Sequence, residues 1–219
     1  VDFITIVAQE ISYTGNRWTD EAEQVCNDLL REGLIDSLTI YKSPPGTHPH
    51  IQETDKRNVG LEICRQEGCT YIMTMDSDEF YVKDELLRAK QVVEEQEINI
   101  ACCSFNMYYK QPIYQDIHIP ETKVAFLQKI TSYSQYVLSE SNRYVNIALL
   151  DPTRTTNIGP PIKLYGQDVI TMHHMCYIRK NGLQSKFKNT SAYTHYFNGV
   201  AEKLEKDYVE WKYIEGSGY

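Results

Sequence analysis

The sequence predicts an α/β fold in one domain, with a mainly parallel central sheet flanked by helices. The chain has 219 residues, enough for one large domain. Over residues 3–108, short strand-like runs alternate with helical patterns in the order β-α-β-α-β-α-β. Strands that alternate with helices form parallel sheets through right-handed crossovers. Because the sequence shows no repeat and no low-complexity linker, we expect a single domain over residues 1–219.

Composition excludes two classes of partner. With 42% apolar and 24% charged residues, the chain is typical of a soluble globular protein. The net charge is −8, and no Lys/Arg cluster is longer than a pair, so no nucleic-acid partner is expected. No apolar run is long enough to span a bilayer. Because a strand-like run begins near Val1, we expect no signal peptide.

The six cysteines match neither a disulfide framework nor a zinc site in their spacing. Several of them fall on apolar faces of predicted helices and strands. We interpret them as reduced core residues, which indicates a cytoplasmic protein.

The first elements follow from hydrophobic periodicity. Phe3–Ala8 predicts a buried strand, and Gln9–Trp18 is the polar loop at its carboxyl end, where open α/β sheets bind ligands. Thr19 is expected to cap a helix that ends at Gly33. A second strand is predicted at 38–41.

The next helix is expected to begin at Thr54 or Asp55 and to end at Gly68. This start places Arg57 in the first helical turn, where the helix dipole disfavours a cation. A bound phosphate would explain the arginine. The alternative is an ordinary surface arginine.

The stretch Tyr71–Phe80 is the most informative in the chain. It begins as a strand and ends in three acids within four residues, Asp76, Asp78 and Glu79. An apolar strand that carries carboxylates to a sheet edge needs something to offset the charge, and a divalent cation would do so. Asp-x-Asp places two carboxylates on one side of an extended segment, close enough to share one ion. The alternative is a solvated acidic turn.

The remaining elements are less regular. The predicted elements are a helix from Asp84 to Glu97, strands at Ile98–Tyr108, Val124–Ile130, Tyr144–Leu150 and Val169–Met172, and a terminal helix at Glu202–Tyr213.

His173 and His174 follow the last predicted strand. Because side chains alternate along a strand, only one of the two can face the acidic residues. We expect His174 to complete a mixed oxygen and nitrogen site suited to Mn²⁺. Binding should then weaken below about pH 6.5, because a protonated imidazole cannot bind a cation. The alternative is a structural histidine.

Two segments resemble GT-A glycosyltransferases. Lys56-Arg57-Asn58-Val59-Gly60, Gly68-Cys69-Thr70-Tyr71-Ile72 and Asp76-Ser77-Asp78 resemble the nucleotide-sugar half of that family, with the spacing intact over 55–80. The segment around His174, Arg179 and Lys186 is similar to the region where many of these enzymes have a late metal-binding histidine. The resemblance implies a GT-A-like fold with a nucleotide-sugar-binding half at 1–108 and an acceptor half at 109–219.

The resemblance also implies roles for single residues. The metal, Mn²⁺ or Mg²⁺, is expected on Asp76, Asp78 and His174, with Asp78 as the stronger ligand. The donor site is expected to include Ala8, Gln9, Glu10, Arg57, Asn58, Asp76, Ser77, Arg179 and Lys186.

A catalytic base is expected only in an inverting enzyme. Asp168 falls where related enzymes have an acidic residue before their final site strand, although they show Glu-Asp and this chain has Gln167-Asp168. A retaining enzyme would need no such base, so both stereochemical outcomes stay open.

The expected activity is metal-dependent transfer of a hexose or deoxyhexose from a UDP-sugar to a glycan or glycoprotein acceptor. The chain resembles small GT-A domains of large-DNA-virus and bacterial glycan-building enzymes, and a viral enzyme would act in the host cytoplasm. A nucleotidyltransferase acting on sugar phosphates and a noncatalytic sugar-binding domain are the alternatives. The sequence carries no indication of the oligomeric state.

Overall fold

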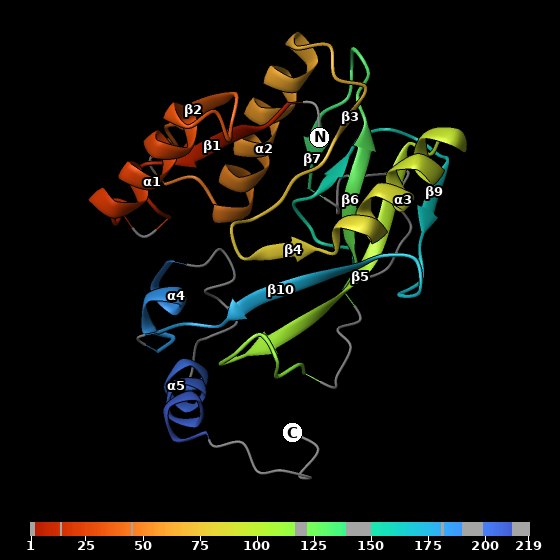
Figure 1. The fold of residues 1–219 in the computed structure, drawn as a ribbon. Coiled ribbons are helices and arrows are strands. Elements are labelled where there is room, and N and C mark those ends of the chain that lie inside the picture. Colours follow the sequence, from red (N-terminus) through yellow and green to blue (C-terminus); the bar gives the residue numbers. More distant parts are fainter. Residues whose placement is uncertain are drawn as a thin grey trace.

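The computed structural model describes residues 3–13, 15–44, 46–116, 122–138, 150–180, 182–189 and 199–211 (Figure 1). The helices are α1 Asp20–Arg31, α2 Pro49–Gln66, α3 Lys83–Glu95, α4 Gln184–Asn189 and α5 Val200–Glu210. The strands are β1 Thr5–Gln9, β2 Ser37–Tyr41, β3 Tyr71–Ile72, β4 Glu79–Tyr81, β5 Ile100–Tyr109, β6 Val124–Lys129, β7 Tyr136–Val137, β8 Thr155–Thr156, β9 Ile162–Leu164 and β10 Thr171–Tyr177.

Helix α1 confirms its predicted signals. The Thr19 hydroxyl accepts a hydrogen bond from the Ala22 N–H at 3.2 Å, which satisfies one of the free donors of the first turn. Beyond the last helical residues, Gly33 adopts a positive φ of 68°, a conformation that favours glycine.

Helix α2 begins earlier than the sequence predicted. It starts at Pro49, and the Nδ1 of His48 accepts from the His50 N–H at 3.2 Å as an N-cap. Proline suits this first position, since the N–H that it lacks would have no helical partner there. Arg57 therefore lies in the third turn, and the helix-dipole argument for a phosphate at Arg57 is wrong.

The predicted mainly parallel central sheet is also wrong. The largest sheet is mixed and has the order β3-β6-β5-β10-β4, with β9 paired to β5. Strand β5 runs parallel to β10 and β9, whereas the β5–β6, β3–β6 and β10–β4 pairs are antiparallel. The β1–β2 pair is parallel but forms a separate two-stranded sheet, as β7 and β8 form another.

The error has a topological cause. Strands β3 and β5 are both antiparallel to β6, so they point the same way, as a crossover through α3 predicts. Strand β6, from the second half of the chain, lies between them. Local sequence predicts the direction of a strand better than it predicts its neighbour, because pairing joins residues far apart in the chain.

Two core clusters position the site. In the larger cluster, α3 packs on the mixed sheet through residues that include Ala89, Val93, Phe126 and Ile170. In the second, Leu61 and Cys64 of α2 pack against Ile72 and Tyr136. All six cysteines are free thiols. The second cluster holds α2 beside the strand that leads to the acidic turn.

Two predicted elements lie partly outside the described residues. Of the strand predicted at 144–150, the structure describes Leu150, which bridges to Lys123. The terminal helix is described up to Glu210.

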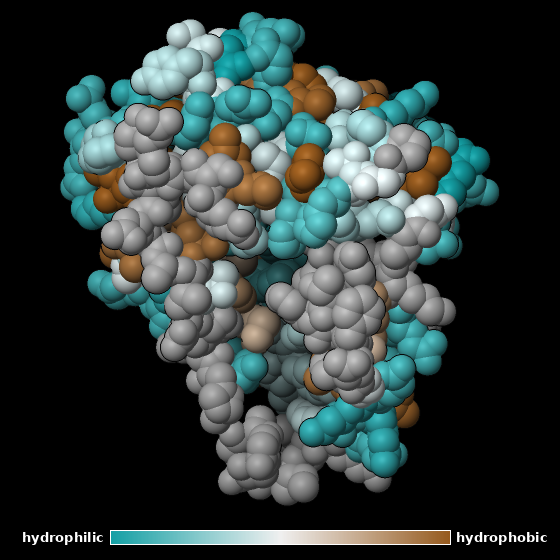
Figure 2. All heavy atoms as spheres, turned by 180° about the vertical axis from the view of Figure 1, so that it is seen from behind, coloured by the Kyte–Doolittle hydropathy of each residue, from teal (hydrophilic) through white to brown (hydrophobic). Residues whose placement is uncertain are grey.

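No helix in the described ranges has the length and apolar character to cross a membrane. From behind, apolar residues form separate patches among hydrophilic ones (Figure 2).

Candidate active site

The acidic turn, Asp76–Asp78, lies between β3 and β4, and the pairing of β4 with β10 joins it to the second half of the chain. Strand β4 pairs antiparallel with β10, so that Glu79 lies opposite His174. The Met175 N–H also donates to the carbonyl of Asp78 at 2.7 Å. Figure 1 shows β4 between α2 and β10. This pairing brings the second half of the chain to the carboxylates of the first.

Asp76 is held by two arginines. Its Oδ1 lies 3.5 Å from Arg57 Nη1, and its Oδ2 lies 2.7 Å from Arg154 Nη2. Desolvation would raise the pKa of Asp76, but Arg154, Arg57, Lys56 and His174 together lower it to about 2. The side chain is still 46% exposed, so this ionised carboxylate faces solvent.

Asp78 is surrounded by a second set of cations. Its Oδ2 lies 3.0 Å from Arg179 Nη2, and its Oδ1 lies 3.6 Å from His174 Nε2. Desolvation raises the pKa of Asp78, but His174, Lys186 and Arg179 outweigh it and lower the pKa. Lys186 lies in α4, with its Nζ 5.8 Å from the ring centre of Tyr177.

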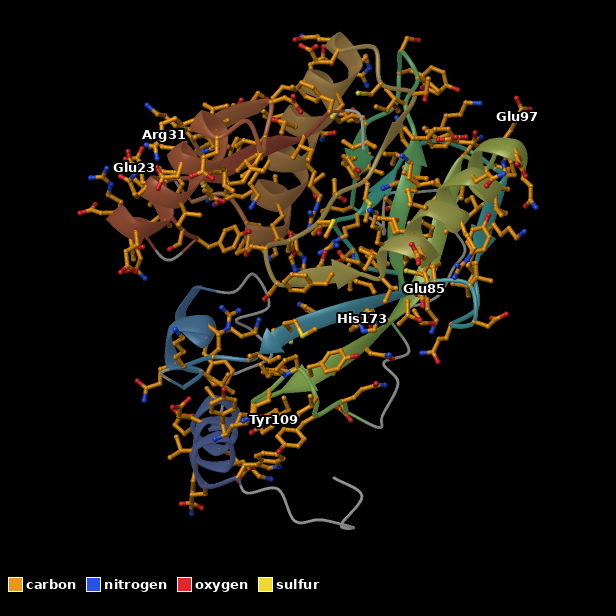
Figure 3. The ribbon with its side chains drawn as sticks, in the orientation of Figure 1. Glu23, Arg31, Glu85, Glu97, Tyr109 and His173 are labelled. Atoms are coloured by element: carbon orange, nitrogen blue, oxygen red, sulfur yellow. The ribbon has the colours of Figure 1, made fainter. Side chains whose placement is uncertain are left out.

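The two histidines face opposite ways, as strand alternation predicts. His174 lies beside Asp78, whereas His173 Nδ1 is 2.7 Å from the hydroxyl of Tyr108. Figure 3 labels His173 on β10. Burial would lower the pKa of His174, but Asp78 and Cys176 outweigh it and raise the pKa to about 10. The role of His174 as a metal ligand stays a prediction.

Arg57 is buried but only loosely bonded. Its guanidinium contacts Asp76 at 3.5 Å and Thr153 at 3.4 Å, both longer than usual for hydrogen bonds. Its Nε has no hydrogen-bond partner among the described residues. Arg57 is therefore a buried, incompletely paired cation next to a carboxylate that faces solvent.

The carboxylates do not depend on a metal for charge balance. Arg57 and Arg154 offset Asp76, and Arg179 offsets Asp78. Within the described part of the chain, no group of three or more His, Cys, Asp or Glu side chains is arranged so that it could hold a metal ion. Asp78 and His174 nevertheless supply the oxygen and nitrogen donors that Mn²⁺ accepts, and the donor chemistry therefore fits the predicted ion.

Asn58 is bound elsewhere. Its side-chain amide donates to the carbonyl of Tyr136 at 3.0 Å, and its Oδ1 accepts from the Tyr136 N–H at 2.7 Å. These bonds attach α2 to β7. Its role as a donor ligand stays a prediction.

The end of β1 carries three residues predicted for the donor site, Ala8, Gln9 and Glu10, and the last two contact different parts of the structure. Gln9 donates to Gln52 of α2 at 2.8 Å, whereas Glu10 contacts Arg17 at 3.4 Å. Glu10 lines a cavity of about 210 Å³ together with Arg17, Trp18, Glu23, Asn27, Leu38 and Ile40. Among the described residues, no hydrogen bond or ion pair joins Ala8, Gln9 or Glu10 to Asp76, Asp78 or Glu79. Ser77 lies in that turn and is exposed.

Asp168 is not brought to the carboxylates. It lies in the exposed turn before Thr171, at the start of β10. Asp78 contacts the other part of that strand, at Met175. Thr171 and Met175 are separated by four residues, about 13 Å along a strand. The structure therefore gives Asp168 no contact with the acidic turn.

Comparisons of this chain with protein-family models, with curated proteins and with solved structures find no match. Its function is therefore inferred from the geometry of the site and from the two motifs.

Arg154 is the site residue that sequence reasoning missed. It is 3% exposed and contacts Asp76, Glu79 and Asp151. The sequence offers one indirect signal, since Glu79 follows an apolar stretch and a buried glutamate needs a cationic partner. Which of the 22 basic residues supplies it depends on the tertiary fold.

Proposed function

We propose that this chain is a metal-dependent glycosyltransferase that uses a UDP-sugar donor. It transfers a hexose or deoxyhexose to a glycan or glycoprotein acceptor in the cytoplasm. The observation that carries the proposal is the convergence of Asp76, Asp78, Arg57, His174 and Arg179 at one turn. These residues come from three separate parts of the sequence, and the two motifs single out all of them.

The arrangement suits a diphosphate. Arg57 contacts Asp76, the partly exposed Arg179 contacts Asp78, and Lys186 adds charge near Asp78. Guanidinium groups bind phosphate oxygens through paired hydrogen bonds. Together these cations would bind the two phosphates and stabilise the negative charge that develops when the sugar leaves.

Asp78 and His174 would hold the divalent ion, with Asp76 as the third predicted ligand. An ion held there would supply Lewis-acid stabilisation of the negative charge on the leaving diphosphate. The chain's own residues would orient the donor, with its phosphates between Arg57 and Arg179.

A thermal-shift screen tests the proposal. UDP, GDP, CMP and dTDP are each added with Mn²⁺ or with EDTA, and the melting temperature is measured. A ligand at about 100 times its Kd stabilises a protein by about 2.7 kcal/mol. For a chain of this size, that corresponds to a rise of about 5–10 °C. We expect UDP with Mn²⁺ to give the largest rise.

The alternatives give different outcomes. When UTP and free sugars are added to the same screen, a nucleotidyltransferase would respond most strongly to the triphosphate. A sugar-binding domain would respond to free sugars and to no nucleotide. If no nucleoside diphosphate raises the melting temperature with Mn²⁺, the proposal is wrong. A positive screen leads to a transfer assay, in which UDP is released from candidate UDP-sugars.

Arg57→Ala should weaken UDP binding more than uridine binding. The buried guanidinium is expected to contact phosphate, and uridine has none. A charge-assisted hydrogen bond contributes about 1.5–3 kcal/mol, which corresponds to a loss of roughly ten- to a hundredfold for UDP. Calorimetry with both ligands measures the difference.

Arg65→Ala is the matched control, because it removes the same charge from the same helix. Arg65 donates to the carbonyls of Thr131 and Ser134, so its loss should lower the melting temperature and leave the ratio of the two affinities unchanged. Equal losses of UDP and uridine affinity in Arg57→Ala would show that Arg57 has a structural role.

A further inference from the structure

The Arg154 guanidinium joins three carboxylates. Its Nη2 lies 2.7 Å from Asp76 Oδ2 and 2.5 Å from Glu79 Oε1, and its Nη1 donates to Glu79 Oε2 at 2.7 Å. Its Nε lies 3.1 Å from Asp151 Oδ2, an ion pair without the geometry of a hydrogen bond. The forked guanidinium can bond several oxygens in fixed directions, which a lysine ammonium cannot do.

The main chain of Arg154 is fixed from the sheet side. Gln128, fully buried in β6, donates its amide to the carbonyl of Arg154 at 3.0 Å and accepts from the Thr156 N–H at 2.9 Å. The Asp151 carboxylate accepts from the Thr153 N–H at 2.9 Å, which closes the turn that precedes Arg154. The main chain of Arg154 is therefore held by the sheet, whereas its guanidinium is held by Glu79 and Asp151.

Glu79 connects this support to the acidic turn. It is 3% exposed, and its Oε2 accepts from the Asp76 N–H at 2.9 Å, while its own N–H donates to the Asp76 carbonyl at 3.1 Å. Glu79 thus binds both the backbone of Asp76 and the guanidinium that holds the Asp76 side chain.

The contact between Arg154 and Asp76 adds little to stability by itself. Solvent screens the ion pair on the side of Asp76, whose side chain is 46% exposed. Its structural effect is directional. Arg154 Nη2 lies within hydrogen-bonding distance of Asp76 Oδ2, whereas Asp76 Oδ1 lies 3.5 Å from Arg57 Nη1. A carboxylate that faces solvent would otherwise rotate among several orientations.

We propose that Arg154 is a positioning residue of the donor site, which fixes the orientation of the Asp76 carboxylate while Glu79 and Asp151 hold Arg154 in place. The inference rests on the proposed function, since it assigns Asp76 to the binding of a nucleotide diphosphate with its metal. Arg154 itself is buried and acts through Asp76.

A double-mutant cycle tests the inference. UDP affinity in the presence of Mn²⁺ is measured by calorimetry for wild type, Arg154→Lys, Asp76→Asn and the double variant. Arg154→Lys keeps the positive charge but loses the planar guanidinium with its fixed donor directions, and we expect UDP affinity to fall about tenfold. In the Asp76→Asn background the same change should have no further effect, because the residue through which Arg154 acts is already altered.

Two further variants separate positioning from folding. Arg154→Lys leaves Glu79 with a weaker partner and can unfold the protein, whereas Arg154→Met with Glu79→Gln removes both buried charges together. The Arg154→Met, Glu79→Gln double variant should keep a cooperative melting transition and still bind UDP about tenfold more weakly than wild type does. Arg65→Lys, the control, should alter melting temperature alone.

The outcomes distinguish failure of the positioning role of Arg154 from failure of the proposed function. If Arg154→Lys lowers affinity by the same factor in wild type and in Asp76→Asn, Arg154 does not act through Asp76 and the inference falls. Unchanged affinity in the folded Arg154→Met, Glu79→Gln variant also overturns it. If wild type binds no nucleoside diphosphate with Mn²⁺, the proposed function and the inference fall together.

Discussion

Asp78→Ala should abolish the effect of Mn²⁺ on UDP binding. Asp78 is the carboxylate closest to His174, and Mn²⁺ bound at this pair would link ion and nucleotide. Two ligands coupled in this way commonly change each other's affinity by about 5–150-fold. In the variant, calorimetry should give the same UDP affinity with Mn²⁺ and with EDTA. Because a metal supplies several kcal/mol of charge stabilisation in the transition state, turnover should fall by roughly 100-fold or more.

Two control variants test whether the effect of Asp78→Ala comes from the loss of the Asp78 carboxylate. Asp20→Ala removes the same charge from the exposed first turn of α1 and should leave UDP and Mn²⁺ binding unchanged. Asp78→Asn keeps the size of the side chain but not its charge, and we expect it to resemble Asp78→Ala. A folded Asp78→Ala protein in which Mn²⁺ still tightens UDP binding would exclude Asp78 as a ligand.

Local signals in the sequence predicted the elements that depend on local physics. Thr19 caps α1 as expected, and β5 and β6 lie within one or two residues of the predicted strands. The split between His173 and His174 follows from the two-residue period of a strand, which no tertiary contact needs to specify. These features depend on residues that are close in sequence.

Features that depend on distant residues were predicted poorly. The sheet is mixed because β6 lies between β3 and β5 and because β4 pairs antiparallel with β10. The sequence predicted strands at β3, β5 and β6, but it did not predict β4 as a separate strand. Arg154 lies 75 residues from Glu79 in the sequence, and nothing near it indicates a site. The early start of α2 came from His48 acting as an N-cap, which the usual cap residues do not suggest.

The charge of the acidic turn is also balanced by residues that are distant in the sequence. An apolar strand that ends in acids does need cations, and the sequence reasoning placed a metal in that role. The structure shows arginines from α2, from the turn before β8 and from the segment after β10 in contact with the acids. The metal is therefore proposed for its chemistry, since folding of the turn does not require it.

The metal affinity of the wild-type protein should rise with pH well above 6.5. From the ordinary pKa of 6.5, His174 would be neutral at pH 7, but Asp78 and Cys176 outweigh the effect of burial and raise its pKa to about 10. Mn²⁺ must then displace a proton from His174 at neutral pH. Affinity should rise about tenfold per pH unit below that pKa, so about a hundredfold from pH 6.5 to 8.5.

Stability of the metal-free protein should change in the opposite direction. A raised pKa in the folded state means that the His174–Asp78 pair stabilises the protein fully below pH 6.5, and that this contribution is lost as pH rises toward 10. Melting temperature with EDTA should therefore fall over the range in which Mn²⁺ affinity grows. His174→Ala should remove both trends and weaken Mn²⁺ binding most at high pH.

His173→Ala is the control, because the same imidazole is removed from the opposite face of β10, where it contacts Tyr108. It should keep both pH trends at an altered melting temperature. Mn²⁺ titrations at pH 6.5, 7.5 and 8.5 with melting curves in EDTA measure all three proteins. A pH-dependent Mn²⁺ affinity that survives in His174→Ala would exclude His174 as the ligand. Its loss in His173→Ala alone would assign the ion to the other face of the strand, since only one imidazole can reach Asp78.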